Sequence, residues 1–253
     1  MSIQITGHQW KWKYDYLDEG IGFFSNLAPS SREVIEGDPR SVENYLLEVD
    51  EPLVVPVDTR IRFLITANDV IHAWWVPDLG WKQDAIPGFV NDAWTEISEP
   101  GIYRGQCAEL CGKDHGFMPI EVHAVSQADY RAWVTERQEA AAALLASADR
   151  EWSQNELMER GKKIYDTTCI ACHQANGQGM PPVFPAIAGS PVATGPIDQH
   201  MELVLNGVPG SAMQAFGPQL SDVDVAAVMT YQRNAFGNDT GDLIQPSDVK
   251  DAR

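Results

Sequence analysis

The sequence lacks any long uncharged apolar run. Its longest runs of this kind, such as residues 140–148, fall far short of the roughly 18 residues that a membrane-spanning helix needs. A secretory signal peptide is missing too, because strand-like sequence follows Met1 at once. The 253 residues as given therefore predict neither a membrane span nor a leader.

Basic residues are scarce. The chain has 18 Lys and Arg against 36 Asp and Glu, and the formal net charge is -18. Residues 1–125 carry 9 basic and 20 acidic residues, and the remainder carries 9 and 16. Since neither part has a basic patch, we expect no nucleic-acid partner and favour a cationic or neutral one. The length predicts one or two domains, and two fit the motifs better.

Cysteine is also rare, and the four cysteines form two close pairs: Cys107 with Cys111, and Cys169 with Cys172. The first pair opens a loop that also contains His115 and Met118. Thiol, imidazole and thioether groups select copper over calcium or magnesium, which prefer oxygen. A structural zinc site is disfavoured because thioethers bind copper and not zinc.

The loop has one cysteine too many for a mononuclear blue-copper site, which uses one Cys, two His and a weak Met. Two cysteines four residues apart can instead bridge two metal ions. The second histidine must then come from elsewhere, and His72 is the candidate. The alternative is a Cys107–Cys111 disulfide, which gives no reason for His115 and Met118 at these spacings.

The motif C-x-E-x-C-x-x-x-H-x-x-M with an upstream V-I-H resembles the binuclear copper centre, CuA, of cytochrome c oxidase subunit II. The resemblance implies one backbone ligand, the carbonyl of Glu109. It implies five side-chain ligands: His72, Cys107, Cys111, His115 and Met118. It also implies that the carboxylate of Glu109, assisted by Asp84, helps to hold magnesium in the full complex alone.

Short strand-like segments broken by Pro and Gly fill residues 1–125 and predict a mainly β Greek-key sandwich or barrel. The resemblance implies a cupredoxin-like fold there. Residues 3–16 alternate as one half-buried strand with Trp10, Trp12 and both tyrosines on one face. Within it, Gly7–Trp12 resembles the aromatic motif of subunit II, which implies that Trp10 is the electron-entry residue. We expect loops over residues 19–44 and 76–88.

A capping box at residues 126–129 predicts a helix, and residues 126–152 are expected to form a helical linker. A second box at residues 153–156 opens a helix that leads into Cys169-Ile170-Ala171-Cys172-His173. C-x-x-C-H is the attachment signature of c-type haem, in which both cysteines form thioethers and His173 binds the iron. A thioredoxin-like pair is the rival, but no strand precedes the motif.

The sixth iron ligand should be a Met or His that follows the motif. The candidates are Met180, His200, Met201, Met213 and Met229. We choose Met213, because its Gly-rich loop lets backbone approach a planar cofactor, whereas Met201 and Met229 fit packed helices. Residues 153–238 resemble class I cytochrome c, which implies an all-α domain; the family's loop usually reads Met-Pro, and here Gln214 replaces that Pro. Residues 239–253 are expected to be a disordered tail.

The copper motif comes before the haem motif, and this domain order resembles that of the caa-type oxidases, whose subunit II carries a fused cytochrome c. It implies electron transfer from a donor through haem c to the copper pair and on to catalytic subunit I, on the periplasmic side. The family carries membrane helices ahead of this point, so we expect an artificial truncated start and a membrane anchor in the full-length protein. The alternatives are a stand-alone redox module and part of another CuA-containing reductase; a nitrous oxide reductase would need more than the six histidines present.

Overall fold

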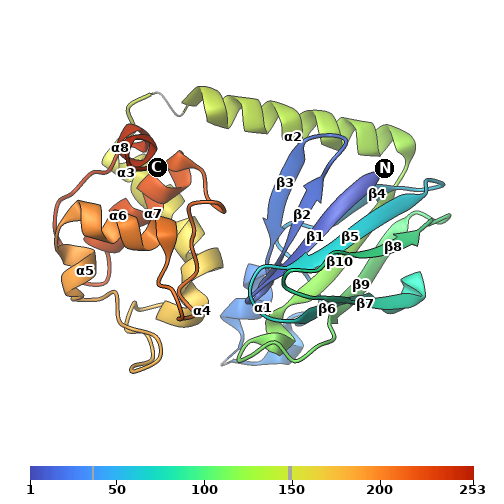
Figure 1. Cartoon of the computed structure of the whole chain (residues 1–253), viewed down its shortest axis with the longest axis horizontal. Helices are drawn as coiled ribbons and strands as arrows, with labels where there is room; N and C mark the ends of the chain where they lie inside the picture. The colour runs from blue at the N-terminus through green and yellow to red at the C-terminus, as the bar shows by residue number, and fades with distance from the viewer. Residues whose placement is uncertain (36, 148–149) are drawn as a thin grey trace. The chain divides into compact units, whose positions relative to one another are not determined.

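The computed structural model describes residues 1–35, 37–147 and 150–253. The chain divides into two compact units, Met1–Ala140 and Ala141–Arg253 (Figure 1). Helix α2 (Gln127–Ser147) occupies most of the expected linker, and the division falls inside it. Residues 148 and 149 of that linker lie outside the described residues.

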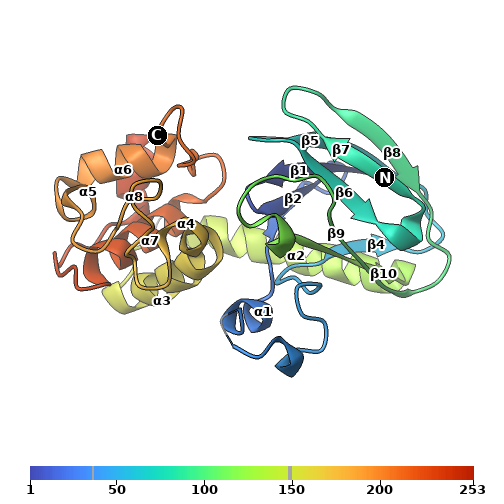
Figure 2. The same ribbon diagram turned by 90° about the horizontal axis from the view of Figure 1, so that it is seen from below.

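The first unit is a sandwich of two five-stranded sheets (Figure 2). One sheet has the order β3 (Ile21–Ser25), β2 (Lys11–Tyr16), β1 (Ser2–His8), β5 (Ile61–Ala67), β8 (Asn91–Thr95). The other has the order β4 (Leu53–Pro56), β10 (Pro119–Val125), β9 (Gly101–Cys107), β6 (His72–Val76), β7 (Trp81–Ala85). β1 pairs with β5 in parallel and β4 with β10 in parallel, and the other pairs are antiparallel. This is the expected mainly β sandwich.

Alternation of apolar residues builds the core between the sheets. In β5, Ile61, Phe63 and Ile65 are buried, while the residues between them are exposed or half-buried. Residues 3–16 form a hairpin and not one strand: β1 and β2 pair from Ile3 with Tyr16 to His8 with Lys11. Trp10 lies in the turn between them, so the single-strand prediction was wrong there.

Two segments expected as loops contain regular elements. Residues 19–44 include β3, α1 (Pro29–Glu33) and the 3-10 turn η1 (Pro39–Ser41). Residues 76–88 include the 3-10 turn η2 (Pro77–Leu79) and β7. Both strands lie at sheet edges, where breaker residues nearby are tolerated because one side of the strand needs no partner.

Helix α2 packs against the edge of the sandwich formed by β3 and β4. Trp133 contacts the rings of Tyr16 and Phe23, with centroids 5.1 and 6.1 Å away. Arg137 forms an ion pair with Glu51, just before β4. Among the described residues, no helix combines the length and apolar character needed to cross a membrane.

The second unit is helical. Its helices are α3 (Gln154–Ile164), α4 (Ile170–His173), α5 (Pro191–Thr194), α6 (Ile197–Asn206), α7 (Asp222–Asn234) and α8 (Pro246–Ala252), with a π turn, η4 (Tyr165–Cys169), between α3 and α4. α3 and α7 cross closely at Gly161, where a Cβ would lie 2.1 Å from the carbonyl oxygen of Ala227. The expected capping box is present, since Ser153 and Glu156 bond each other's backbone.

The disordered tail expected over residues 239–253 was wrong. Ile244 and Val249 are buried in one apolar cluster with residues of α6 and α7. Gln245 caps α8, and the guanidinium of Arg253 donates to the carbonyl oxygens of Gly217 and Leu220. Two apolar residues in a polar segment are too few to show a hydrophobic periodicity in the sequence, but they are sufficient to anchor the tail to the core formed by α6 and α7.

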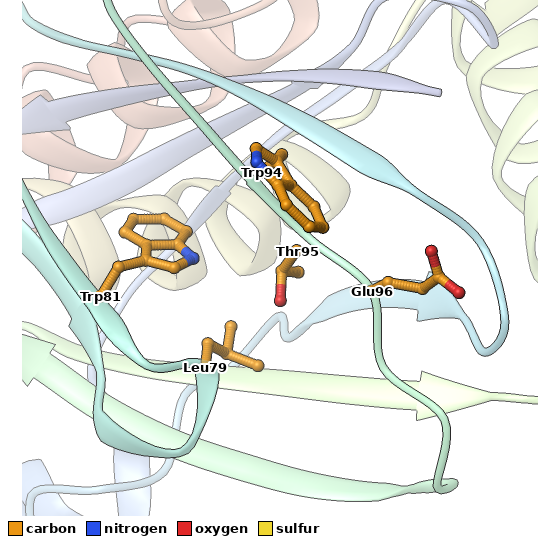
Figure 3. A pocket seen from close by; sticks show the side chains of 5 residues that line it. All are labelled: Leu79, Trp81, Trp94, Thr95 and Glu96. Atoms are coloured by element: carbon orange, nitrogen blue, oxygen red, sulfur yellow. The ribbon is translucent and has the colours of Figure 1, made fainter.

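A cavity of about 610 Å³ lies between edge strands β7 and β8. Figure 3 shows Leu79, Trp81 and Thr95 directed toward one another, with the carboxylate of Glu96 turned away. Trp81 pairs with Val76 at one end of β7, whereas Ala85 pairs with His72 at the other. The cavity is therefore distant along the strand from His72.

Candidate metal centre and haem-attachment site

The sulfur atoms of Cys107 and Cys111 lie at the centre of the predicted copper site. Their Sγ atoms are 3.8 Å apart and are not joined in a disulfide. His72 Nδ1 lies 4.0 Å from Cys107 Sγ, and His115 Nδ1 lies 3.4 Å from Cys111 Sγ. Each sulfur thus has one imidazole beside it. Donor atoms of His72, Cys107 and Cys111 all lie within 4.8 Å of one another, a spacing that suits a metal ion.

Sheet register brings these residues together at one end of the sandwich. Trp74 in β6 pairs with Cys107 at the end of β9, so His72 at the start of β6 faces that cysteine. The connection from β9 to β10 contains Cys111 and the turn η3 (His115–Phe117). A rigid sheet holds one imidazole and one thiol, and a loop supplies the others.

The remaining predicted copper ligands, Glu109 and Met118, lie next to Cys107. The carbonyl oxygen of Glu109 lies 3.4 Å from Cys107 Sγ. Met118 is 1% exposed, and its carbonyl oxygen accepts from the Cys107 N–H at 3.0 Å. Asp84 is placed on β7, with its carboxylate 3.5 Å from Lys82 Nζ. The structure therefore groups the copper residues, while the magnesium role of Glu109 and Asp84 stays a prediction.

The two thiols share one negative charge when no metal is bound. The hydrogen bond from Cys111 and the nearby His72 lower the pKa of Cys107 to about 3, against the effect of burial. The same bond, with burial, raises the pKa of Cys111. A thiolate paired with a thiol is a donor set ready to lose one more proton to a soft cation.

Asp69 orients the ring of His72, and the sequence interpretation missed it. Its Oδ1 lies 2.8 Å from His72 Nε2. Because a carboxylate only accepts, this nitrogen carries the proton and Nδ1 is left to bind metal. Asp69 also accepts from the Gln9 N–H at 2.7 Å. The available signal was a carboxylate three residues before a candidate ligand histidine.

Trp10 lies directly against the copper loop. Its indole Nε1 donates to the Cys111 carbonyl oxygen at 3.1 Å, and the Gln9 side-chain amide donates to the same oxygen at 2.8 Å. Gly112, with a φ of +118°, lets the loop pass under the indole, since a Cβ there would lie 3.0 Å from Trp10 Cζ2. Trp10 is thus one hydrogen bond from the backbone of a predicted copper ligand.

The C-x-x-C-H motif spans the end of η4 and all of α4. Cys169 and Cys172 are half-buried and not joined in a disulfide. His173 Nδ1 donates to the Pro185 carbonyl oxygen at 2.8 Å, which leaves Nε2 as the nitrogen that can bind iron. Burial lowers the pKa of His173 against this bond, so the ring is held neutral, as a metal ligand must be. The residues present therefore fit covalent haem.

The packing separates the candidates for the sixth ligand. Met201 and Met229 are in the apolar cluster of α6, α7 and α8, and His200 Nε2 contacts Gln232 Oε1 at 3.0 Å. Met180 pairs with Phe184 in a short turn. Met213 is half-buried in a loop closed by the bond from Val208 N–H to its carbonyl oxygen. Met213 as the iron ligand stays a prediction.

Comparisons with known proteins cover both units separately. Residues 1–125 match the family described as cytochrome c oxidase subunit II, periplasmic domain, and residues 156–231 match cytochrome c oxidase, cbb3-type, subunit III. The chain is 45% identical over 134 residues to the probable cytochrome c oxidase subunit 2 of Rickettsia prowazekii, covering 53% of this chain and 41% of that protein. It is 48% identical over 135 residues to the mitochondrial subunit 2 of Vigna unguiculata, covering 53% and 36%.

The periplasmic domain of subunit II of cytochrome oxidase from Bradyrhizobium japonicum is a solved structure similar to the first unit. It is 40% identical, and the match covers 55% of this chain and 94% of that one with a TM-score of 0.49. The chain spans about half or less of the length of the curated relatives named above.

The β sandwich with its paired-thiol loop, followed by a helical C-x-x-C-H unit, defines a protein with a cupredoxin-like domain followed by a cytochrome c domain. More narrowly, residues 1–125 belong to the cytochrome c oxidase subunit II family.

Proposed function

We propose that this chain is the electron-transfer part of a haem-copper oxidase subunit II, with a binuclear CuA centre in its first unit and covalent haem c in its second. The observation that carries the proposal is the pair of sulfurs 3.8 Å apart, each beside an imidazole, in a chain that also contains C-x-x-C-H. When bound, the copper pair and the haem supply one-electron oxidation and reduction. The protein supplies the ligands, their orientation and the exclusion of water.

The first unit is built to hold copper with little rearrangement. Both thiols and His72 are buried, and Asp69 fixes the His72 ring. His115, Met118 and the Glu109 carbonyl complete the ligand set that we propose. Because strands β6 and β9 hold two of the ligands in register, the geometry changes little when the charge of the site changes.

The second unit holds haem by its two cysteines and His173, with Met213 as the proposed sixth ligand. Pro185 sets the His173 ring through the bond to Nδ1. Trp10 is the proposed point of electron entry to the copper site. Its hydrogen bond to the Cys111 carbonyl supports this role, because it joins the indole directly to the copper loop.

The partners follow from the family. We propose that the chain delivers electrons to catalytic subunit I, receives them from a separate donor, and works on the periplasmic side as part of a longer, membrane-anchored protein. A magnesium ion held by Glu109, with Asp84 nearby, belongs to that assembly. The excess of acidic residues supports a cationic or neutral donor.

The test is to produce the chain with haem maturation and copper and to measure metal content, optical spectra and EPR. We expect two coppers and one haem per chain, a mixed-valence copper signal, and rapid equilibration of an electron between haem and copper. A chain with both cofactors but no exchange between them would support the alternative of a redox module without a transfer role.

A second measurement examines the division of labour with subunit I. With a reductant supplied, the isolated chain should consume oxygen no faster than a haem-free control. Sustained uptake that depends on haem and copper would mean that the chain is an oxidase by itself and would refute the proposed role as one relay.

A further inference from the structure

Two buried polar residues of the second unit, His200 and Gln232, form hydrogen bonds that end at the first cysteine of C-x-x-C-H. Gln232 of α7 donates from Nε2 to Cys169 Sγ at 3.8 Å, and its Oε1 lies 3.0 Å from Nε2 of His200 on α6. His200 is 4% exposed and Gln232 is 5% exposed. Neither residue is among the predicted iron ligands that the proposed function uses.

The chemistry of the groups determines which of them donates in each of these two hydrogen bonds. An amide oxygen only accepts, so His200 Nε2 must carry the hydrogen. With its oxygen held by His200, the Gln232 amide can present only its N–H groups to the sulfur. Burial, together with the nearby Arg233, lowers the pKa of His200 to about 4 against the effect of the bond to Gln232, so His200 is neutral at pH 7.

The His200–Gln232 pair fills its space in the core less favourably than two apolar side chains would. His200 Nδ1 is buried and has no hydrogen-bond partner among the described residues, which destabilises the fold. Neighbouring positions of α6 and α7, including Met201, Val204 and Met229, are filled with apolar side chains. An apolar pair would fill the same space without an unsatisfied nitrogen, so packing alone gives no reason for His and Gln here.

We propose that Gln232 is a positioning residue for the haem, directing an amide N–H at the sulfur of Cys169, and that His200 holds the amide in that orientation. The inference rests on the proposed function, since it requires haem bound through Cys169. The positive end of the amide dipole next to a sulfur bonded to the porphyrin favours the reduced, less positive haem. Gln232 therefore raises the reduction potential of the haem.

The experiment compares variants of the full haem-loaded chain by redox titration. Gln232→Met keeps the side-chain size but removes the N–H, and we expect covalent haem with a lower midpoint potential. His200→Leu should give a smaller shift in the same direction, because the amide is then free to rotate. Thr230→Val is the matched control, because Thr230 is a buried residue of the same helix, α7, as Gln232. The substitution removes the hydrogen bond that Thr230 Oγ1 accepts from Ile244 N–H, and it should lower the melting temperature without changing the reduction potential.

An unchanged potential in Gln232→Met, or an equal change in Thr230→Val, would overturn the inference while leaving the proposed function intact. Absence of covalent haem in the unsubstituted chain would instead contradict the proposed function. If Gln232→Met does not fold, NMR of the unsubstituted ferric protein decides. The Gln232 side-chain amide signals should be strongly shifted by the paramagnetic iron, and unshifted signals would refute the proposal.

Discussion

Asp69 accepts a hydrogen bond from His72 at 2.8 Å, and its other carboxylate oxygen accepts one from the backbone of Gln9 at 2.7 Å. The neighbouring Gln9 and Trp10 side chains both bond the carbonyl of Cys111. One hairpin turn therefore connects the residues around two predicted copper ligands that are 39 positions apart in sequence. The position of each ligand depends on this turn as well as on its own loop.

Replacing Asp69 with Asn should weaken copper binding by about 10- to 100-fold, the usual cost of losing a carboxylate behind a ligand histidine. The Asn side chain can still form a hydrogen bond with His72, but because an amide can donate as well as accept, it no longer favours one orientation of the ring. Competition against a copper chelator measures the change. Asp92→Asn on β8, which removes an exposed ion pair with Arg62 of β5, is the control and should leave affinity unchanged. Equal affinities for all three proteins would exclude the orienting role.

Replacing Cys107 with Ser should abolish the mixed-valence copper EPR signal and leave the haem absorption bands intact. A serine oxygen is a hard ligand that does not bridge two soft ions as a thiolate does. EPR and copper content of the same sample measure the result. A variant that keeps two coppers with a delocalised signal would rule out bridging by Cys107.

Replacing Met213 with Ala should remove the sulfur-to-iron absorption band, open the haem to small ligands and lower its potential, because thioether ligation favours reduced iron. Met180→Ala is the comparison, since Met180 is in the turn closed by Phe184. Optical titration with imidazole or cyanide measures the opening. If Met180→Ala opens the haem and Met213→Ala does not, the assignment is reversed.

Local patterns predicted the elements that depend on local chemistry. The capping box at Ser153 and the alternation in β5 could be predicted because each depends on residues a few positions apart. The tail was not readable, because α8 is held by contacts of Val249 with α6 and α7, far away in sequence. The predicted copper ligands were identified by their spacing, whereas Asp69, Gln9 and Pro185 contact predicted ligands or their loops through the fold and had little or no sequence signal.

The buried His200 predicts how the stability of the second unit depends on pH. Its pKa is lowered to about 4 in the folded chain, mainly by burial, against an ordinary value of about 6.5 when unfolded. Above pH 6.5 the ring is neutral in both states, so it adds no pH dependence to the free energy of unfolding. As pH falls from 6.5 to 4 the unfolded chain takes up a proton that the folded chain refuses, so the free energy of unfolding drops by about 3 kcal/mol in total.

Chemical denaturation of the haem-loaded chain, followed at the haem absorption band, measures this loss at several pH values. Carboxylates contribute as well: the Arg233 guanidinium keeps the pKa of Asp242 low against the effect of burial, so its protonation also destabilises the fold in acid. His200→Gln retains those carboxylates and lacks the imidazole. The variant should therefore lose less stability between pH 6.5 and 4 than the unsubstituted chain, and parallel pH profiles for the two proteins would show that His200 takes up its proton in the folded state.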